Sequence, residues 1–345
     1  MGAVSNSAKR TIAVFGASGH TGRFVVAELL RRGFTPLAVG RSAAKLMASG
    51  FQERGVAIRT AAIEEPGSLD RAFAGAAAVI NCAGPFLDTA EPIAAAALRA
   101  RIHYLDVTAE QASALATFER FGAASREAGV SVIPAMGFYG GFGDLLATTA
   151  MGHWDYADEI SLSIALDSWQ PTLGTRKTGQ RNTARRLTII NRKLAPAPAP
   201  SPQAFRDFPE PFGRQEVTEI PFSEAVLMAR HLQVSMLRTY LNNTPLRDIR
   251  DDTTPPPVAA DETGRSNQIF LVDVMVRKGT ATRRATARGR DIYAFTAPLV
   301  VEAVRRILDG ETRGSGALAP GEIFEAKPYL EALVPEHLVL EMRAE

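Results

Sequence analysis

The sequence predicts an α/β protein: an N-terminal doubly wound parallel sheet, then a second α+β domain, then a C-terminal segment that returns to the first domain. Three features lead to this prediction. Short apolar runs alternate with helical patterns over the first 150 residues, which is typical of successive βα units. A glycine-rich turn directly follows the first apolar run. After Ala150 the alternation stops and the pattern of a different domain begins.

The composition fits a globular protein of more than one domain. With 345 residues, 46% hydrophobic and 22% charged, the chain can bury a sizeable core, and two domains fit this length better than one. The formal net charge of +2 argues against a nucleic-acid partner. A single cysteine, Cys82, excludes an internal disulfide and favours a reducing compartment. No segment resembles a signal peptide or has the roughly 20 apolar residues of a membrane span, so we expect a cytoplasmic protein.

The first domain is expected over residues 9–150. Its predicted strands are Thr11–Phe15, Pro36–Val39, Ala57–Ala62, Ala78–Ala83, His103–Asp106 and Val130–Pro134. Its predicted helices are Gly22–Arg32, Ser42–Glu53, Glu91–Ala100 and Glu110–Ala128. Six strands in this rhythm form a doubly wound sheet, whose ligands bind at the carboxyl ends of the strands.

The rest of the chain is predicted to form an α+β domain for substrate binding or dimerisation over residues 151–290, and C-terminal helices over 291–345 that pack on the first domain. A proline-rich tract, Leu194–Pro202, predicts a loop because proline cannot continue a helix. The other predicted elements are a strand at Glu159–Leu166, a basic helix after it, an antiparallel hairpin of Gln268–Lys278 and Thr280–Gly289, and helices at Ala294–Leu308 and Lys327–Leu333.

The glycine-rich turn lies where a nucleotide-binding loop is expected, between the first strand and a helix. Gly16 allows a sharp turn, Gly19 leaves room for backbone to approach a pyrophosphate, and Gly22 lets the helix pack closely on the sheet. Backbone N–H groups at the helix start then face the phosphates. The alternative is a tight βα turn of some other α/β protein. We therefore predict a Rossmann-type domain whose cofactor-binding loop contains Gly16, Ser18, Gly19, His20, Thr21 and Gly22.

The residues after the second strand predict NADP(H) rather than NAD(H). An acidic residue there would bind the ribose hydroxyls of NAD(H), but the chain has Arg41 and Ser42, with Lys45 one helical turn later. A guanidinium binds a 2′-phosphate through charge-assisted hydrogen bonds, and Ser42 at a helix N-cap adds a hydroxyl. The alternative is that Arg41 is a solvated loop charge.

Three further motifs follow later strands of the first domain. They are Val79-Ile-Asn-Cys-Ala-Gly-Pro-Phe86, His103-Tyr-Leu-Asp-Val-Thr-Ala-Glu110 and Gly137-Phe-Tyr-Gly-Gly-Phe-Gly-Asp144. Together with the glycine-rich turn they resemble the saccharopine dehydrogenase-like family, which includes saccharopine reductases, polyamine-pathway reductases and trans-acting enoyl reductases. The resemblance implies an oxidoreductase. It also implies that the cofactor, near its nicotinamide ribose, lies along Cys82, Ala83, Gly84, Pro85 and Phe86.

Two departures limit the resemblance. The family commonly has Asp-x-Thr-Gly-Glu where this chain has Ala109 in place of the glycine, and Gly-Phe-Asp-Ser where this chain has Tyr139 in place of the aspartate. Cofactor binding survives both changes. The substrate of the lysine pathway does not follow from the resemblance.

Tyr139 and Asp106 are the candidate catalytic residues. Tyr139, in the turn after the sixth strand, is placed to donate a proton as hydride arrives, and its alternative role is packing at the domain junction. Asp106 at the end of the fifth strand either positions substrate or, like Glu110, caps a helix. Cys82 is assigned no nucleophilic role, because hydride transfer needs no nucleophile. The histidines have no partner at metal-ligand spacing, so no metal site is predicted.

The predicted function is NADPH-dependent hydride transfer to a C=N, C=C or C=O bond of a small molecule in a cleft between the domains. No tyrosine has a lysine four residues later, so the proton relay of short-chain dehydrogenases is absent. Two alternatives stay open: an enoyl reductase that acts on a carrier-bound acyl chain, and a non-catalytic NADP(H)-binding redox sensor. Lys177, Arg181 and Arg185 share one predicted helix face, either as a solvated surface or as a site for an acidic carrier protein. A homodimer also stays open.

Overall fold

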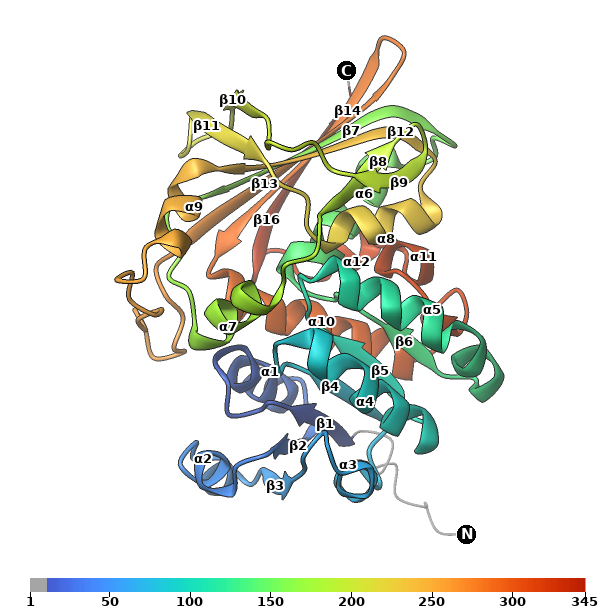
Figure 1. Ribbon diagram of the computed structural model, residues 1–345, viewed down its shortest axis with the longest axis vertical. Coiled ribbons are helices and arrows are strands. Elements are labelled where there is room, and N and C mark those ends of the chain that lie inside the picture. The colour runs from blue at the N-terminus through green and yellow to red at the C-terminus, as the bar shows by residue number, and fades with distance from the viewer. Residues whose placement is uncertain (1–10, 345) are drawn as a thin grey trace. The chain divides into compact units, whose positions relative to one another are not determined.

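The protein is described by a computed structural model over residues 11–344, so the predicted domain start at residue 9 lies outside the described residues. The chain divides into two units. The first unit contains the chain up to Gly137 together with Thr296–Leu318. The second unit contains Phe138–Phe295 and the chain from Ala319 onward. Figure 1 shows the helices and strands of both units.

The first unit is built on a seven-stranded parallel sheet in the order β15-β6-β5-β4-β1-β2-β3. The strands are β1 (Thr11–Phe15), β2 (Thr35–Gly40), β3 (Ala57–Thr60), β4 (Ala78–Asn81), β5 (His103–Asp106), β6 (Ser131–Ile133) and β15 (Gly316–Ala317). The six predicted strands are confirmed, with small differences at their ends. The chain order reverses between β1 and β4, and this switch point is where ligands of doubly wound sheets bind.

The helices of the first unit connect these strands. They are α1 (His20–Arg31), α2 (Ala43–Met47), the short η2 (Gln52–Arg54), α3 (Pro66–Phe73), α4 (Phe86–Arg99) and α5 (Gln111–Ala128). The predicted helix Ser42–Glu53 is wrong in extent, because α2 ends before a turn at Gly50, where φ is +66°. Helix α3 was not predicted, and α4 begins at Phe86 rather than at Glu91. Helices α4 and α5 pack against each other beside β4, β5 and β6.

The second unit contains a nine-stranded sheet whose main path is β10-β11-β12-β7-β13-β14-β16, with β8 paired to β12 and to β9. The strands are β7 (Ala157–Leu166), β8 (Leu187–Ile190), β9 (Lys193–Pro196), β10 (Gln203–Asp207), β11 (Arg214–Glu219), β12 (Val234–Asn242), β13 (Ile269–Lys278), β14 (Ala281–Arg290) and β16 (Leu338–Ala344). The predicted hairpin is confirmed as β13 and β14. The proline-rich tract, predicted to be a loop, begins inside β9.

The helices of the second unit are η3 (Phe138–Phe142), α6 (Gly143–Met151), α7 (Leu173–Arg181), α8 (Ser223–His231), α9 (Asn243–Arg250), α11 (Pro320–Ile323) and α12 (Ala326–Glu331). The basic helix α7 ends at Arg181, so Arg185 does not share its face as predicted. Within residues 11–344, no helix combines the length and apolar character that a membrane span requires.

The C-terminal segment divides between the two units. Helix α10 (Ile292–Leu308) leads into the first unit, where Glu302 pairs with Arg32 at the end of α1 and β15 extends the parallel sheet beside β6. From Ala319 the chain belongs to the second unit, and β16 pairs with β14. The return of the chain to the first unit therefore holds for Thr296–Leu318. The predicted packing of all of residues 291–345 on that domain does not match this division, because β14 provides an edge for the last strand.

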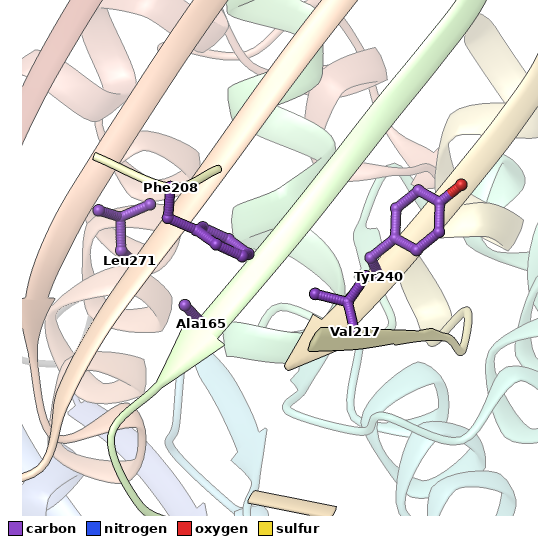
Figure 2. Packing of buried hydrophobic residues seen from close by; sticks show 5 residues of the cluster. All are labelled: Ala165, Phe208, Val217, Tyr240 and Leu271. Carbon is purple, nitrogen blue, oxygen red and sulfur yellow. The ribbon is translucent and has the colours of Figure 1, made fainter. Parts of the chain in front are cut away.

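A small apolar cluster of the second unit joins β7, β11, β12, β13 and the loop after β10 (Figure 2). Phe208 of that loop lies near Ala165 and Leu271, which are paired across β7 and β13. The other members are Val217 and Tyr240. This cluster fixes the β10–β11 hairpin on the sheet, because burying such side chains away from water is the main driving force of packing.

Candidate functional site

The glycine-rich turn after β1 has no room for side chains at two positions. Gly16 has φ +81°, and a Cβ there would lie 2.9 Å from the Cβ of Ala83 in the loop after β4. A Cβ at Gly22 would lie 2.3 Å from the carbonyl oxygen of Gly16. Gly16 donates its N–H to the carbonyl of Val39 at the end of β2 (2.8 Å). The turn is thus held against both neighbouring strand ends at the switch point.

Helix α1 starts in this turn without a side-chain cap. Gly19 is its N-cap and is exposed, and the Arg23 N–H donates to the carbonyl of Gly19 (3.1 Å). Ser18 and Thr21 are half-buried in the same loop, and the His20 ring packs edge-on against Phe24, with centroids 5.2 Å apart. An uncapped helix N-terminus carries roughly half a positive charge and binds anions such as phosphate. The loop geometry therefore suits a pyrophosphate.

Two exposed cations flank the start of α2. Ser42 is the N-cap of α2, as predicted, and its hydroxyl oxygen accepts the N–H of Lys45 (3.3 Å). Its own hydroxyl hydrogen is left for another acceptor. The side chains of Arg41 and Lys45 are exposed, and within residues 11–344 neither forms an ion pair or a side-chain hydrogen bond. This end of β2 offers donors and positive charge, with no carboxylate beside them.

The loop from Cys82 to Phe86 is held by polar groups that the sequence interpretation missed. Buried Asn81 accepts the N–H of Ala83 (3.0 Å) and donates to the hydroxyl of Thr89 (3.1 Å), which in turn donates to the carbonyl of Ala83 (2.6 Å). Residues Cys82, Ala83, Gly84 and Pro85 are half-buried. Burial raises the pKa of the Cys82 thiol far above its ordinary value, so this thiol is a poor nucleophile. The one available signal for this network was an asparagine inside an otherwise apolar strand.

Glu110 caps a helix other than the one it precedes. Its fully buried carboxylate accepts the N–H groups of Phe86 (2.7 Å) and Leu87 (3.2 Å), which begin α4. It makes no side-chain cap on α5. The capping interpretation is therefore right about the role and wrong about the helix. The distant cap also explains why α4 starts earlier than its sequence pattern predicts.

Asp106 joins the ends of β5 and β6. It is fully buried, and its carboxylate accepts the Tyr104 hydroxyl (2.9 Å) and the N–H groups of Thr108 (3.0 Å) and Ala135 (2.8 Å). Burial raises the pKa of Asp106 to about 6, against the effect of these hydrogen bonds. With three donors already bound, the carboxyl has a structural task, and this favours the structural interpretation over the predicted catalytic one.

Tyr139 lies in the second unit, in the kinked turn η3. Its backbone (φ −88°, ψ 65°) and that of Gly140 are not helical. Its ring packs between those of Trp169 and Phe222, with centroid distances of 5.1 Å and 4.3 Å. The side chain is 8% exposed, and its hydroxyl has no hydrogen-bond partner among the described residues. Tyr139 is therefore a packed aromatic residue that also carries an unpaired buried hydroxyl.

Asp144 is placed in the first turn of α6, where it binds two other segments of the second unit. Its carboxylate accepts the N–H of Gly321 (2.7 Å) and lies 2.7 Å from Nε2 of His231. Burial lowers the pKa of His231, but the Asp144 carboxylate outweighs it, so the pKa is raised above its ordinary value. Within residues 11–344, no group of three or more His, Cys, Asp or Glu residues is arranged to hold a metal.

Known proteins resemble the first unit in sequence. Residues 8–105 match the NmrA-like family. The saccharopine dehydrogenase-like oxidoreductase of Bos taurus is 30% identical over 147 residues, which are 37% of this chain and 34% of the bovine protein. A probable mitochondrial saccharopine dehydrogenase-like oxidoreductase of Arabidopsis thaliana is 29% identical over 140 residues, 36% of this chain and 31% of that protein. The first unit is thus similar in sequence to part of several saccharopine dehydrogenase-like oxidoreductases. The match spans about a third of each relative.

The fold of the whole chain also has a known counterpart. Apo saccharopine dehydrogenase (L-Glu forming) from Saccharomyces cerevisiae superposes with a TM-score of 0.65 over 97% of this chain and 100% of that chain, at 14% sequence identity. At this identity the likeness concerns the fold. Together these findings confirm the resemblance read from the sequence motifs and the α/β fold class. The first unit has a Rossmann-like fold.

Proposed function

We propose that the protein is an NADPH-dependent oxidoreductase that transfers hydride to a C=N, C=C or C=O bond of a small molecule. The observation that carries the cofactor choice is the pair of exposed, unpaired cations, Arg41 and Lys45, on either side of the Ser42 N-cap. Val39, two residues before Arg41, accepts the N–H groups of both Gly16 and Ala17. The cationic end of β2 and the glycine-rich turn are therefore adjacent parts of one surface.

The residues present fit NADPH. The uncapped start of α1 suits the pyrophosphate, and a 2′-phosphate matches the guanidinium of Arg41, the ammonium of Lys45 and the hydroxyl of Ser42. The absence of a carboxylate at this end of β2 removes the usual partner of the NAD ribose hydroxyls. When bound, NADPH supplies the hydride, and the protein orients it and manages the proton.

Tyr139 is the proposed proton donor. Gly137, two residues before it, lies against Val107 after β5, where an added Cβ would be 3.0 Å from the Val107 carbonyl oxygen. An unpaired phenol hydroxyl is able to donate to a substrate atom without first breaking another hydrogen bond.

To test this proposal, the protein is mixed with NADPH and with each member of a panel of imines, enones and ketones, and the oxidation of NADPH is measured by its absorbance. We expect at least one class of substrate to be reduced, and NADPH to be used in preference to NADH. Tight NADPH binding without turnover on any class of substrate would contradict the enzymatic proposal and would indicate a redox sensor. Turnover with NADH at the same efficiency would contradict the cofactor assignment.

A second candidate is reduction of an acyl chain bound to an acidic carrier protein. It is supported by α7, where Leu173 is 68% exposed and Lys177 is exposed one turn later, an apolar and basic surface suited to an acidic partner. The same enoyl group offered as a free thioester and on a carrier protein distinguishes the two proposals. A large preference for the carrier that Lys177→Glu abolishes would favour this candidate. Equal rates would favour a free small molecule.

We also propose a cytoplasmic location, supported by the single cysteine. We further propose a homodimer, which light scattering of the purified protein tests. A monomeric mass at micromolar concentration would contradict the dimer. Fractionation of the native host with an antibody tests the location, and recovery in a membrane-bounded compartment would contradict it.

A further inference from the structure

The hydroxyl of Tyr293, at the start of α10, joins several segments of the second unit through hydrogen bonds. Its oxygen accepts the indole Nε1–H of Trp169 (2.9 Å) and lies 2.8 Å from the hydroxyl oxygen of Thr175 on α7. The N–H of Thr172, the N-cap of α7, donates to the same oxygen at 3.4 Å. One phenol oxygen therefore connects the first turn of α10, the loop after β7 and the first turn of α7.

Trp169 is held at both its backbone and its ring. Its backbone N–H donates to the carboxylate of Asp248 on α9 (2.7 Å), and its indole N–H donates to Tyr293. The side chain is 7% exposed. An indole has a single polar group, the Nε1–H donor, and this donor is bonded only when the ring has one particular orientation. The hydrogen bond to Tyr293 therefore selects one orientation of the buried ring.

The orientation of Trp169 matters because its ring packs on Tyr139. The two rings are stacked, with centroids 5.1 Å apart and planes at 29°. Phe222 and Phe138 also contact the Tyr139 ring, with centroid distances of 4.3 Å and 4.9 Å. The Tyr139 hydroxyl is buried and has no hydrogen-bond partner among the described residues, so no hydrogen bond sets its direction. The position of this hydroxyl therefore depends on how its own ring is packed.

We propose that Tyr293 is a positioning residue, whose hydroxyl fixes the Trp169 ring and, through it, the hydroxyl of Tyr139. This inference rests on the proposed role of Tyr139 as proton donor. A proton donor must lie within hydrogen-bond reach of the atom that takes the proton, and a displacement of about 1 Å can lower a rate by about 10²-fold. The rings of Phe222 and Phe138 have no polar group that another side chain could bind. Trp169 is therefore the contact through which a hydrogen bond controls the Tyr139 ring.

The first test is Tyr293→Phe, which keeps the ring and removes the hydroxyl. With a substrate that the wild-type protein reduces, we expect kcat to fall by about tenfold or more, and NADPH affinity to stay the same. Trp169→Phe removes the donor of the same hydrogen bond and should also lower kcat. Thr188→Val is the matched control. It removes another buried hydrogen bond of the second unit, from the Thr188 hydroxyl to the Leu237 carbonyl (2.7 Å), and should lower the melting temperature without lowering kcat.

A double variant separates positioning from a loss of stability. If Tyr293 acts through the phenol of Tyr139, adding Tyr293→Phe to Tyr139→Phe should lower kcat no further, because the hydroxyl that Tyr293 positions is already absent. The free energy of unfolding should still fall, because the hydrogen bond to Trp169 is lost in either background. A further fall in kcat as large as that of Tyr293→Phe alone would overturn the inference.

The fluorescence of Trp169 is a readout that needs no substrate. The chain has two tryptophans, so Trp154→Phe leaves Trp169 as the single reporter. In this background, Tyr293→Phe should shift the emission maximum and increase quenching by acrylamide, because the indole loses its acceptor and its ring is less firmly held. Thr188→Val should change neither quantity. An unchanged emission maximum and unchanged quenching in Tyr293→Phe would mean that the hydroxyl does not fix the ring, and would overturn the inference.

The outcomes separate this inference from the proposed function. An unchanged kcat in Tyr293→Phe, with a substrate for which Tyr139→Phe is strongly impaired, would overturn the role of Tyr293 and leave Tyr139 as the donor. If Tyr139→Phe itself keeps the full rate, the proton-donor role of Tyr139 fails, and the role of Tyr293 fails with it.

Discussion

The carboxyl edge of the first sheet and the aromatic region around Tyr139 differ in whether their buried polar groups have hydrogen-bond partners. At the sheet edge, the carboxylates of Asp106 and Glu110 accept five hydrogen bonds between them, and the amide of Asn81 is also bonded. Around Tyr139, the hydroxyls of Tyr139 and Ser223 have no partner among the described residues. Polar groups of the first kind hold strand ends in place, whereas unpaired groups are available to a ligand or a reaction.

The largest expected effect is that of removing the unpaired hydroxyl. Tyr139→Phe should lower kcat by about 10²–10⁴-fold, the usual contribution of a positioned general acid, while NADPH affinity stays the same. Its thermal stability should not fall, because no hydrogen bond is lost. Steady-state kinetics and a melting curve measure both quantities. An unchanged kcat would mean that the contrast between the two regions has no catalytic meaning.

Gly19→Val tests the glycine-rich turn. A Cβ at this position lies 3.1 Å from the carbonyl oxygen of Gly16, which is tight but tolerable, and the branched side chain would fill the space in front of the start of α1. We expect a folded protein that no longer binds NADPH in a calorimetric titration. Normal affinity in the folded variant would place the dinucleotide elsewhere.

Substitutions of Asp106 test whether the polar groups at the sheet edge have a structural role. Asp106→Ala leaves three buried donors without an acceptor and should lower the free energy of unfolding by at least about 2 kcal/mol. Asp106→Asn keeps an oxygen for both backbone N–H groups and should be far milder. A folded Asp106→Asn variant that has lost turnover but not NADPH binding would instead indicate a catalytic role.

Comparison of the wild-type protein with Asp106→Asn also tests how the free energy of unfolding depends on pH. The pKa of Asp106 is about 6 in the folded protein against an ordinary value of 3.8, so the folded state binds the proton more tightly than the unfolded state. The contribution of Asp106 to stability should therefore decrease as pH rises from 3.8 to about 6. This slope should be absent in Asp106→Asn. Urea denaturation at several pH values measures it.

The smallest expected effect concerns His231, which links α8 to Asp144 on α6. Its pKa is raised, so the stabilisation is complete below the ordinary histidine pKa and is lost as pH rises through the folded value. His231→Gln should remove this dependence at a cost of about 1.5–3 kcal/mol at low pH, as for a hydrogen bond to a charged group. Equal losses at low and high pH would contradict the ion pair.

Much of the first unit could be predicted from local sequence, because a buried parallel strand is an apolar run and a βα turn at a nucleotide site needs glycines in a fixed order. The six strands, the glycine-rich turn and the Ser42 N-cap follow from neighbouring residues. The start of α4 could not be predicted, since Glu110 caps it from 24 residues away. The division of the C-terminal segment between the two units could not be predicted either, because β16 pairs with β14, which is distant in the sequence.

The contacts of Tyr139 could not be predicted from neighbouring residues in the sequence either. Trp169 and Phe222 are brought to it by the tertiary fold, and no periodicity connects them to the turn after β6. The sequence placed Asp106 correctly at a strand end, but its three donors, one of them from the loop after β6, decide what it does there. Position at a sheet edge is thus predictable, whereas the task of a polar group requires its partners.

Calorimetric titration of the wild-type protein and of Arg41→Ala, with NADPH and with NADH, tests the proposed preference for NADPH most directly. Arg41 is exposed and its side chain has no partner among the described residues, so the substitution should leave the fold intact. We expect Arg41→Ala to weaken NADPH binding by at least about tenfold, equivalent to roughly 1.5–3 kcal/mol for a charge-assisted contact, and to change NADH binding little. Equal losses for both cofactors, or no loss for NADPH, would contradict it.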